Sequence, residues 1–358
     1  MRIPYVHARL LLATPDALVP FLIVVTVLTV LWLRDRRATP KTSAAPGVIV
    51  IGVMLTAILV WFFHAGRIDW QQTGDWGKDW LYYSAARQAV TELRLPYYIA
   101  MTLQNTDQYL ANPETMWAPH VVLLPLLGLQ YFFVVHMTAC FIAGFVALAR
   151  LRRELNISLY SFAIFALLFI LNGHITSHLG QGHTQWSAYF LLPWILLCLV
   201  RFSSGDGSRG NTVTLAVTLA AMIAVGGWHV FIWSLLFTIA WCARSLKGVR
   251  FVAPALVMVG ALSAYRLVPV LAAFVPESAE FFGGNPPWLL PQALAGDIGR
   301  AVGKLEWWEY DAYIGYVGFV VLLMGLVPRP KAGGRRLIDE FRQPSLMLIG
   351  LCSSTSMV

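Results

Sequence analysis

Long apolar stretches recur along the chain and are separated by short polar segments. A helix that crosses the hydrocarbon core of a bilayer needs about 20 mostly apolar residues, with roughly 17 to 25 tolerated. The pattern therefore predicts an all-α, polytopic transmembrane helix bundle of about 9–10 spans. The expected spans are 17–33, 47–64, 130–149, 157–172, 186–202, 211–226, 228–243, 251–274 and 312–328, and a further stretch begins near Ser345.

Basic residues gather in five of the short segments between the apolar stretches. These segments hold 17 of the 26 Lys and Arg residues, and cytoplasmic loops of membrane proteins carry such an excess. They are Arg34–Lys41, Arg150–Arg153, Arg201–Arg209, Arg244–Arg250 and Arg329–Arg342. If they are cytoplasmic, successive spans alternate and the N-terminus lies outside. The segments left on the outer side are then 65–129, 173–185, 226–228 and 275–311.

Composition agrees with a protein of the plasma (inner) membrane. Hydrophobic residues make up 58% of the 358 positions and charged residues 12%, about half the roughly 25% that is typical of soluble domains. The net charge of +8 lies mainly in the short loops, so we expect the lipid bilayer and no nucleic acid as a partner. One domain over 1–358 is expected, with a C-terminal truncation. Its parts are two helices (17–64), a first outer loop (65–129), a helix bundle (130–274), a second long outer loop (275–311) and the last helices (312–358).

Acidic residues and histidines concentrate in the expected outer segments. The two long outer loops hold 12 of the 18 Asp and Glu residues. From Asp79 onward the first loop has a helical pattern, with Tyr82, Tyr83, Ala86 and Val90 on one face, and we expect this helix to lie along the membrane surface. Asp79 then either caps the helix or faces a cleft above the bilayer as a general base.

The features around the first outer loop resemble those of GT-C glycosyltransferases. An apolar helix is followed by Asp79 before a Tyr-rich amphipathic helix and by Leu95–Tyr98, and Trp117–His120 then leads into Leu124–Leu126. The resemblance implies an integral membrane enzyme of the inverting type. Such an enzyme takes a sugar from a polyprenyl-phosphate donor at the extracytoplasmic face and passes it to a glycan, lipid or protein acceptor. It assigns the base that deprotonates the acceptor hydroxyl to Asp79, with Asp75 as the second choice.

A histidine-rich segment, 172–186, is followed by Leu192–Trp194 and resembles the YfhO-like branch of the same superfamily. His174 and His178 would share one helical face, and His183 could fold back towards them. Three imidazoles could hold a divalent metal, but the spacing matches no metalloenzyme motif, and two glycines in the segment argue against a rigid helix. The histidines could instead bind sugar hydroxyls or phosphate, or they could simply be polar residues at the membrane interface.

Arg266 is the one Lys or Arg that falls well inside an apolar span. Inserting an Arg into the membrane interior costs roughly 3 kcal/mol on insertion scales, so we expect an Arg at such a position to have a function. Counted from the cytoplasmic end of its span, Arg266 lies about 22 Å into a hydrocarbon core that is roughly 30 Å thick. At this depth it could bind a lipid phosphate or snorkel to the interface. The segment in which Glu309 precedes Tyr313–Gly315 again resembles the YfhO-like branch. Glu309 and Tyr83 are expected to contact the substrate.

Motifs of soluble nucleotide enzymes are missing from the sequence: there is no Walker A loop, no Gly-x-Gly-x-x-Gly fingerprint and no Gly-x-Ser-x-Gly elbow. This favours a lipid-linked donor. Two other classes remain open. One is a transporter or lipid flippase, which usually places polar residues near the bilayer midplane. The other is an inactive or fragmentary GT-C-like protein, because an extra helix precedes the family's usual first helix and its later helices are missing.

Overall fold

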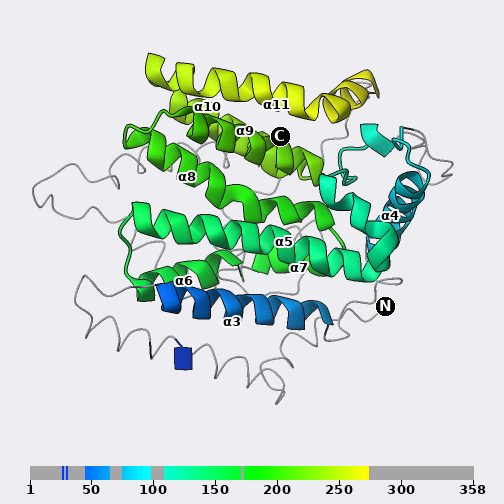
Figure 1. Ribbon diagram of the computed structural model, residues 1–358, viewed down its shortest axis with the longest axis horizontal. Helices are drawn as coiled ribbons and strands as arrows, with labels where there is room; N and C mark the ends of the chain where they lie inside the picture. Colours follow the sequence, from blue (N-terminus) through cyan, green and yellow to red (C-terminus); the bar gives the residue numbers. More distant parts are fainter. Residues whose placement is uncertain are drawn as a thin grey trace, which may run out of the picture.

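The computed structural model describes residues 26–27, 30, 45–64, 75–97, 109–170 and 173–273. Within these ranges all the regular structure is helical and no strand occurs (Figure 1). The elements are α3 (Ala45–His64), α4 (Trp76–Thr91), η1 (Tyr109–Ala111), η2 (Pro119–Leu123), α5 (Leu124–Glu154), α6 (Leu159–Ile170), α7 (Gly173–Gln181), η3 (Thr184–Leu191), α8 (Leu192–Ser203), α9 (Arg209–Ala224), α10 (Trp228–Cys242) and α11 (Leu246–Ala273).

Three continuous helical stretches are long and apolar enough to cross a bilayer, namely Pro119–Glu154, Thr184–Ser203 and Leu246–Ala273. The all-helical, multi-pass character predicted from the sequence is therefore confirmed. The full number of spans stays a prediction, since most of 17–33 and all of 274–358 lie outside the described residues.

Prolines and glycines mark where these long helices begin and bend. Pro125 occupies the first turn of α5, where its missing N–H leaves no hydrogen bond unmade. Gly128 interrupts the same helix with a φ of 70°. Pro254 and Pro269 lie inside α11, and neighbouring groups in a helical bundle can re-satisfy the backbone carbonyls that such prolines leave free.

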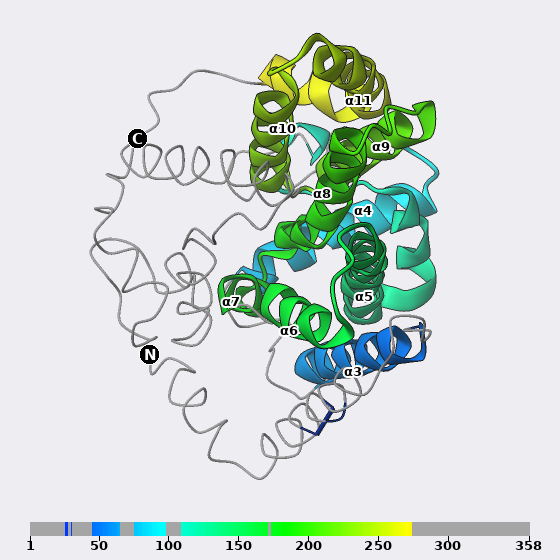
Figure 2. The same cartoon turned by 90° about the vertical axis from the view of Figure 1, so that its left-hand side faces the viewer.

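The long helices pack side by side. Both views show the same order, from α11 through α9, α8 and α5 to α3, with α10 beside α9 and α6 beside α3 (Figures 1 and 2). Close approach of α3 depends on two glycines, because a Cβ on Gly47 would meet Leu159 and one on Gly52 would meet Phe145. The shared core contains Phe132, Phe141, Phe162 and other large apolar side chains.

The two ends of the bundle differ in chemistry. At one end the last turn of α5 meets the last turn of α8 through the Arg201–Glu154 ion pair at 2.8 Å, and the end of α10 joins them through the hydrogen bond from Trp241 to Ser203. Three of the predicted basic segments therefore lie together at this end. At the other end α4 lies across the bundle (Figure 1), and the Trp117 amide donates to the Ala224 carbonyl.

Candidate functional site

Helix α4 carries both carboxylates that the sequence singled out. It begins at Trp76, so Asp75 occupies the cap position, although its side chain makes no capping hydrogen bond. Asp79 lies within the first turn, and the expectation that Asp79 is the cap is wrong. Tyr82, Tyr83 and Ala86 lie on the buried face as predicted, but Ala89 completes that face and Val90 is only half-buried.

The start of α4 is held against the end of the histidine-rich segment, about a hundred residues away in sequence. The Asp75 amide donates to the Gln181 carbonyl at 2.8 Å, and the Trp76 indole N–H donates to the Gly180 carbonyl at 3.1 Å. Gly182 makes this contact possible. Its φ is +95°, and a Cβ there would come within 2.5 Å of the Trp76 backbone nitrogen.

Gly182→Ala is expected to destabilise the protein by about 2 kcal/mol or more, because it adds a backbone collision to an unfavourable φ. Thermal unfolding in detergent measures the loss. Gly77→Ala in α4 is the matched control, since a Cβ there meets nothing within 4 Å, and it should leave stability unchanged or raise it by about 1 kcal/mol. Equal effects of the two substitutions would contradict the close contact at Gly182.

Asp79 is a buried carboxylate with a hydroxyl partner. Its side chain is 2% exposed, and the Thr184 hydroxyl donates to Asp79 Oδ2 at 2.6 Å. The Tyr83 hydroxyl lies 3.3 Å from Thr184 Oγ1 and therefore acts as the donor to it. Burial raises the pKa of Asp79 from its ordinary value to about 7, although the Thr184 hydrogen bond opposes this. The carboxylate is thus shielded from solvent, and its expected role as a general base that faces a cleft stays a prediction.

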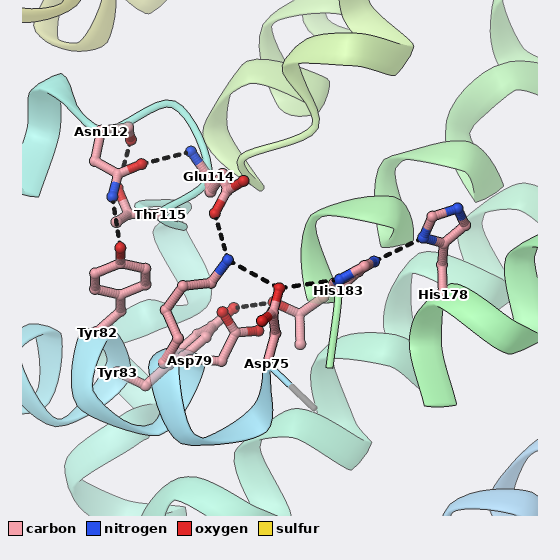
Figure 3. A network of polar contacts seen from close by, with 11 residues as sticks. Asp75, Asp79, Tyr82, Tyr83, Asn112, Glu114, Thr115, His178 and His183 are labelled. Carbon is pink, nitrogen blue, oxygen red and sulfur yellow. Dashed lines mark hydrogen bonds and ion pairs between the residues drawn. The ribbon is translucent and has the colours of Figure 1, made fainter. Parts of the chain in front are cut away.

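Asp75 is the centre of a second, more exposed network (Figure 3). His183 Nε2 lies 3.0 Å and Lys78 Nζ 3.1 Å from Asp75 Oδ2, and Lys78 also donates to Glu114 at 2.7 Å. The hydrogen bond from His183 is the main cause that lowers the pKa of Asp75 to about 2. Burial opposes a charge on Lys78, but Glu114 and Asp75 outweigh it and raise the pKa of its ammonium group. Asp75 and Lys78 therefore both carry charge at neutral pH.

The histidine-rich segment forms a helix and then a turn. α7 runs through Gly180 to Gln181, so the expectation that the glycines prevent a rigid helix is wrong for Gly180. His178 Nδ1 lies 2.7 Å from His183 Nδ1, as Figure 3 shows, and one of the two nitrogens must donate to the other. The His178 ring also stacks on Trp186, with centroids 4.4 Å apart.

A metal site has no support in the part of the chain that the structure describes. No group of three or more His, Cys, Asp or Glu side chains there is arranged to hold a metal ion. His178 and His183 contact each other directly, whereas the side chain of His174 lies outside the described residues. Glu309, the expected substrate contact, also lies outside them.

Arg266 is fully buried, with 0% of its surface exposed, and it binds protein groups. Its two terminal nitrogens donate to the Thr115 hydroxyl and the Asn112 carbonyl, both at 2.8 Å, with the Pro113 carbonyl at 3.3 Å. It neither snorkels to the interface nor is open to a lipid phosphate, because it has no exposed surface and these acceptors take three of its five N–H groups. Arg266 instead fixes the segment that carries Glu114, the partner of Lys78.

Sequence reasoning missed Lys78, Glu114 and Thr184, which join the predicted residues. Lys78 gave a usable signal, since a cation three residues after Asp75 on a helix can reach it. Glu114 and Thr184 gave none, because their contacts span 36 and 105 residues. Comparison with protein-family models, curated proteins and solved structures finds no significant match. The fold and the site therefore identify the class of protein but no family: it is a multi-pass helical membrane protein with a charged cluster at one end.

Proposed function

We propose that this protein is a membrane glycosyltransferase that transfers a sugar from a polyprenyl-phosphate-linked donor to an acceptor at the extracytoplasmic face. One observation carries the proposal. Asp75 and Asp79 on α4 meet His183 and Thr184 from the histidine-rich segment, at the end of the bundle opposite the basic turns. Two sequence segments that independently resemble the same superfamily thus contribute to one cluster.

Asp79 is the proposed general base. A base works best when its pKa lies near the working pH, and burial brings the pKa of Asp79 to about 7. Thr184 fixes the orientation of the carboxylate. Since the side chain is 2% exposed, the groups that cover Asp79 must move aside before an acceptor hydroxyl can reach it.

Asp75 and Lys78 are the proposed substrate-binding groups, because they are charged and accessible. The side chain of Asp75 is 42% exposed and that of Lys78 is 24% exposed. A carboxylate accepts hydrogen bonds from sugar hydroxyls, and an ammonium group binds phosphate as a point charge. Lys78 therefore replaces Arg266 as the cation proposed for the donor phosphate, and Arg266 becomes a positioning residue.

A transfer assay tests this function. Purified protein in liposomes receives a radiolabelled polyprenyl-phosphate sugar and a membrane extract as the source of acceptors. Transfer should release polyprenyl phosphate and move the label to an acceptor, in a reaction that needs the Asp79 carboxylate. Uptake of labelled solute without cleavage of any donor, or equal transfer by Asp79→Asn, would overturn the proposal.

The proposed sidedness predicts which end of the bundle is reached from outside the cell. In a cysteine-free background, a membrane-impermeant maleimide should label Leu93→Cys on intact cells, because Leu93 follows α4 and is 94% exposed. Ser204→Cys, exposed in the turn after α8, should react only after permeabilisation. The reverse pattern would place the charged cluster in the cytosol and remove the basis for a lipid-linked donor.

A further inference from the structure

Three polar side chains from three elements form a hydrogen-bonded chain beside the charged cluster. His120 Nε2 of η2 lies 2.8 Å from His136 Nδ1 on α5, and His136 Nε2 lies 2.9 Å from the Ser187 hydroxyl of η3. His136 and Ser187 have 0% exposed surface, whereas His120 is half-buried. The chain therefore leads from the protein surface into the interior of the bundle.

A chain of this kind can pass protons in either direction. A neutral imidazole has one donor nitrogen and one acceptor nitrogen, and a hydroxyl both donates and accepts. His120, His136 and Ser187 can therefore be satisfied with their protons pointing inward or outward. Ionisable groups inside a membrane domain are expensive and mark functional paths, among which histidine chains serve as proton relays.

The inner end of the chain lies next to the Asp79 network. Ser187 and Thr184 are three residues apart on η3, where side chains of that spacing share a face about 6 Å apart. Cys140 lies between the two networks, because its thiol lies 3.9 Å from His136 Nδ1 and hydrogen-bonds with Ser187, and Tyr83 of the Asp79 network lies nearby.

The hydroxyl groups that contact Asp79 do not themselves take up a proton near neutral pH. Thr184 donates to its carboxylate, and Tyr83 lies behind Thr184. Lys78 and Glu114 act on it as charges. Lys78 already holds its proton in the ion pair with Glu114, so it is not poised to take up the Asp79 proton.

We propose that His120, His136 and Ser187 form a relay that exchanges the proton of Asp79 with the protein surface. This role rests on the proposed function, in which Asp79 takes a proton from the acceptor hydroxyl in every cycle and must release it. Ser187 and Thr184 are not hydrogen-bonded to each other, so reorientation of these two hydroxyl groups has to close the first step.

For each proton that enters the relay at Ser187, one proton leaves it at His120. Ser187 receives the incoming proton on Oγ and passes its own to His136 Nε2. His136 passes its Nδ1 proton to His120 Nε2, and His120 releases its Nδ1 proton to water. Rotation of the Ser187 hydroxyl and return of the imidazole tautomers reset the chain. No oxidant or other co-reactant is needed.

A nucleophilic role for Ser187 fits the structure less well. A serine beside a histidine that a third group orients is a recurring arrangement for covalent catalysis. However, Ser187 has no exposed surface, so a carbonyl or phosphoryl substrate would have to displace the groups that cover it. A proton needs only the hydrogen bonds that are already present.

Infrared spectroscopy after a rapid pH jump across neutrality tests the relay in the full-length protein in lipid nanodiscs. The band of the protonated Asp79 carboxyl is identified by its loss in Asp79→Asn. His136→Gln keeps an amide in place of the imidazole but cannot pass a proton between its two ends. It should slow the change of this band at least tenfold without moving its midpoint pH.

Ser187→Ala, a smaller change, should slow the exchange as well and keeps the test decisive if His136→Gln fails to fold. His229→Gln is the control, since His229 is exposed at the start of α10 and lies outside the relay. Unchanged exchange in a folded His136→Gln or Ser187→Ala protein would overturn the relay, whatever the outcome of the transfer assay. Slowed exchange without any sugar transfer by the wild type would support the relay and overturn the glycosyltransferase proposal.

Discussion

Asp79→Asn is expected to reduce sugar transfer at least 100-fold and, at pH 8, to raise the stability of the protein. General base catalysis typically contributes 10²–10⁴-fold to a rate, which sets the size of the first effect. The second effect follows from burial. The wild type holds an ionised carboxylate in a side chain that is 2% exposed, whereas Asn has the same shape, no charge and an oxygen that still accepts the Thr184 hydrogen bond.

The sign of the pH dependence follows from the raised pKa of Asp79. Between about pH 4 and pH 7 the folded protein keeps a proton on Asp79 that the unfolded chain has lost, so wild-type stability falls as pH rises through this window. Each pKa unit corresponds to about 1.4 kcal/mol, which makes the total a few kcal/mol. The gain in stability of Asp79→Asn over the wild type should be absent below pH 4 and should reach its full size above pH 7.

Thermal unfolding in detergent at pH 4, 6 and 8 measures the stability change, and the liposome assay measures transfer. Glu92→Gln is the control on the same helix, because it removes a carboxylate that is exposed and pairs only with Arg94 and Gln88. It should change neither quantity. An Asp79→Asn protein with the pH profile of the wild type would mean that Asp79 does not titrate near neutrality.

Arg266→Met is expected to destabilise the protein by about 1.5–3 kcal/mol, the range for losing buried hydrogen bonds from a charged donor. The substitution keeps a long side chain but removes the hydrogen bonds that the Thr115 hydroxyl and two backbone carbonyls accept from the guanidinium group. Arg266→Lys should recover only part of the loss, because a single ammonium group cannot reproduce the planar fork that reaches three acceptors.

Arg250→Met is the matched control, since Arg250 is exposed on the same helix, and it should be nearly neutral. Thermal unfolding and the KM for the lipid-linked donor are measured together. We expect Arg266→Met to lower the unfolding temperature and to reduce transfer through loss of the Glu114 segment. A raised KM at unchanged stability would mean that Arg266 binds the donor phosphate after all.

The sequence located most helices well because burial in a bilayer imposes a strong one-dimensional signal. The predicted spans 211–226 and 228–243 became α9 (Arg209–Ala224) and α10 (Trp228–Cys242) within two residues at each end. The span 157–172 agrees equally well with α6 (Leu159–Ile170). The helix α7, which follows almost at once, was not among the predicted elements, because the apolar pattern does not mark it.

What the sequence determined by itself is therefore the helical, multi-pass architecture and the gathering of acidic residues and histidines in the same group of loops. Apolar length and charge asymmetry act along the chain and can be read without knowing the packing. Only the tertiary structure decided what those residues do to one another. The Thr184 contact that holds Asp79 spans 105 residues, and the carbonyls that bind Arg266 lie about 150 residues before it. Burial and hydrogen bonding, which set the pKa of Asp79 and close Arg266 to outside ligands, depend on three-dimensional neighbours that no local pattern specifies.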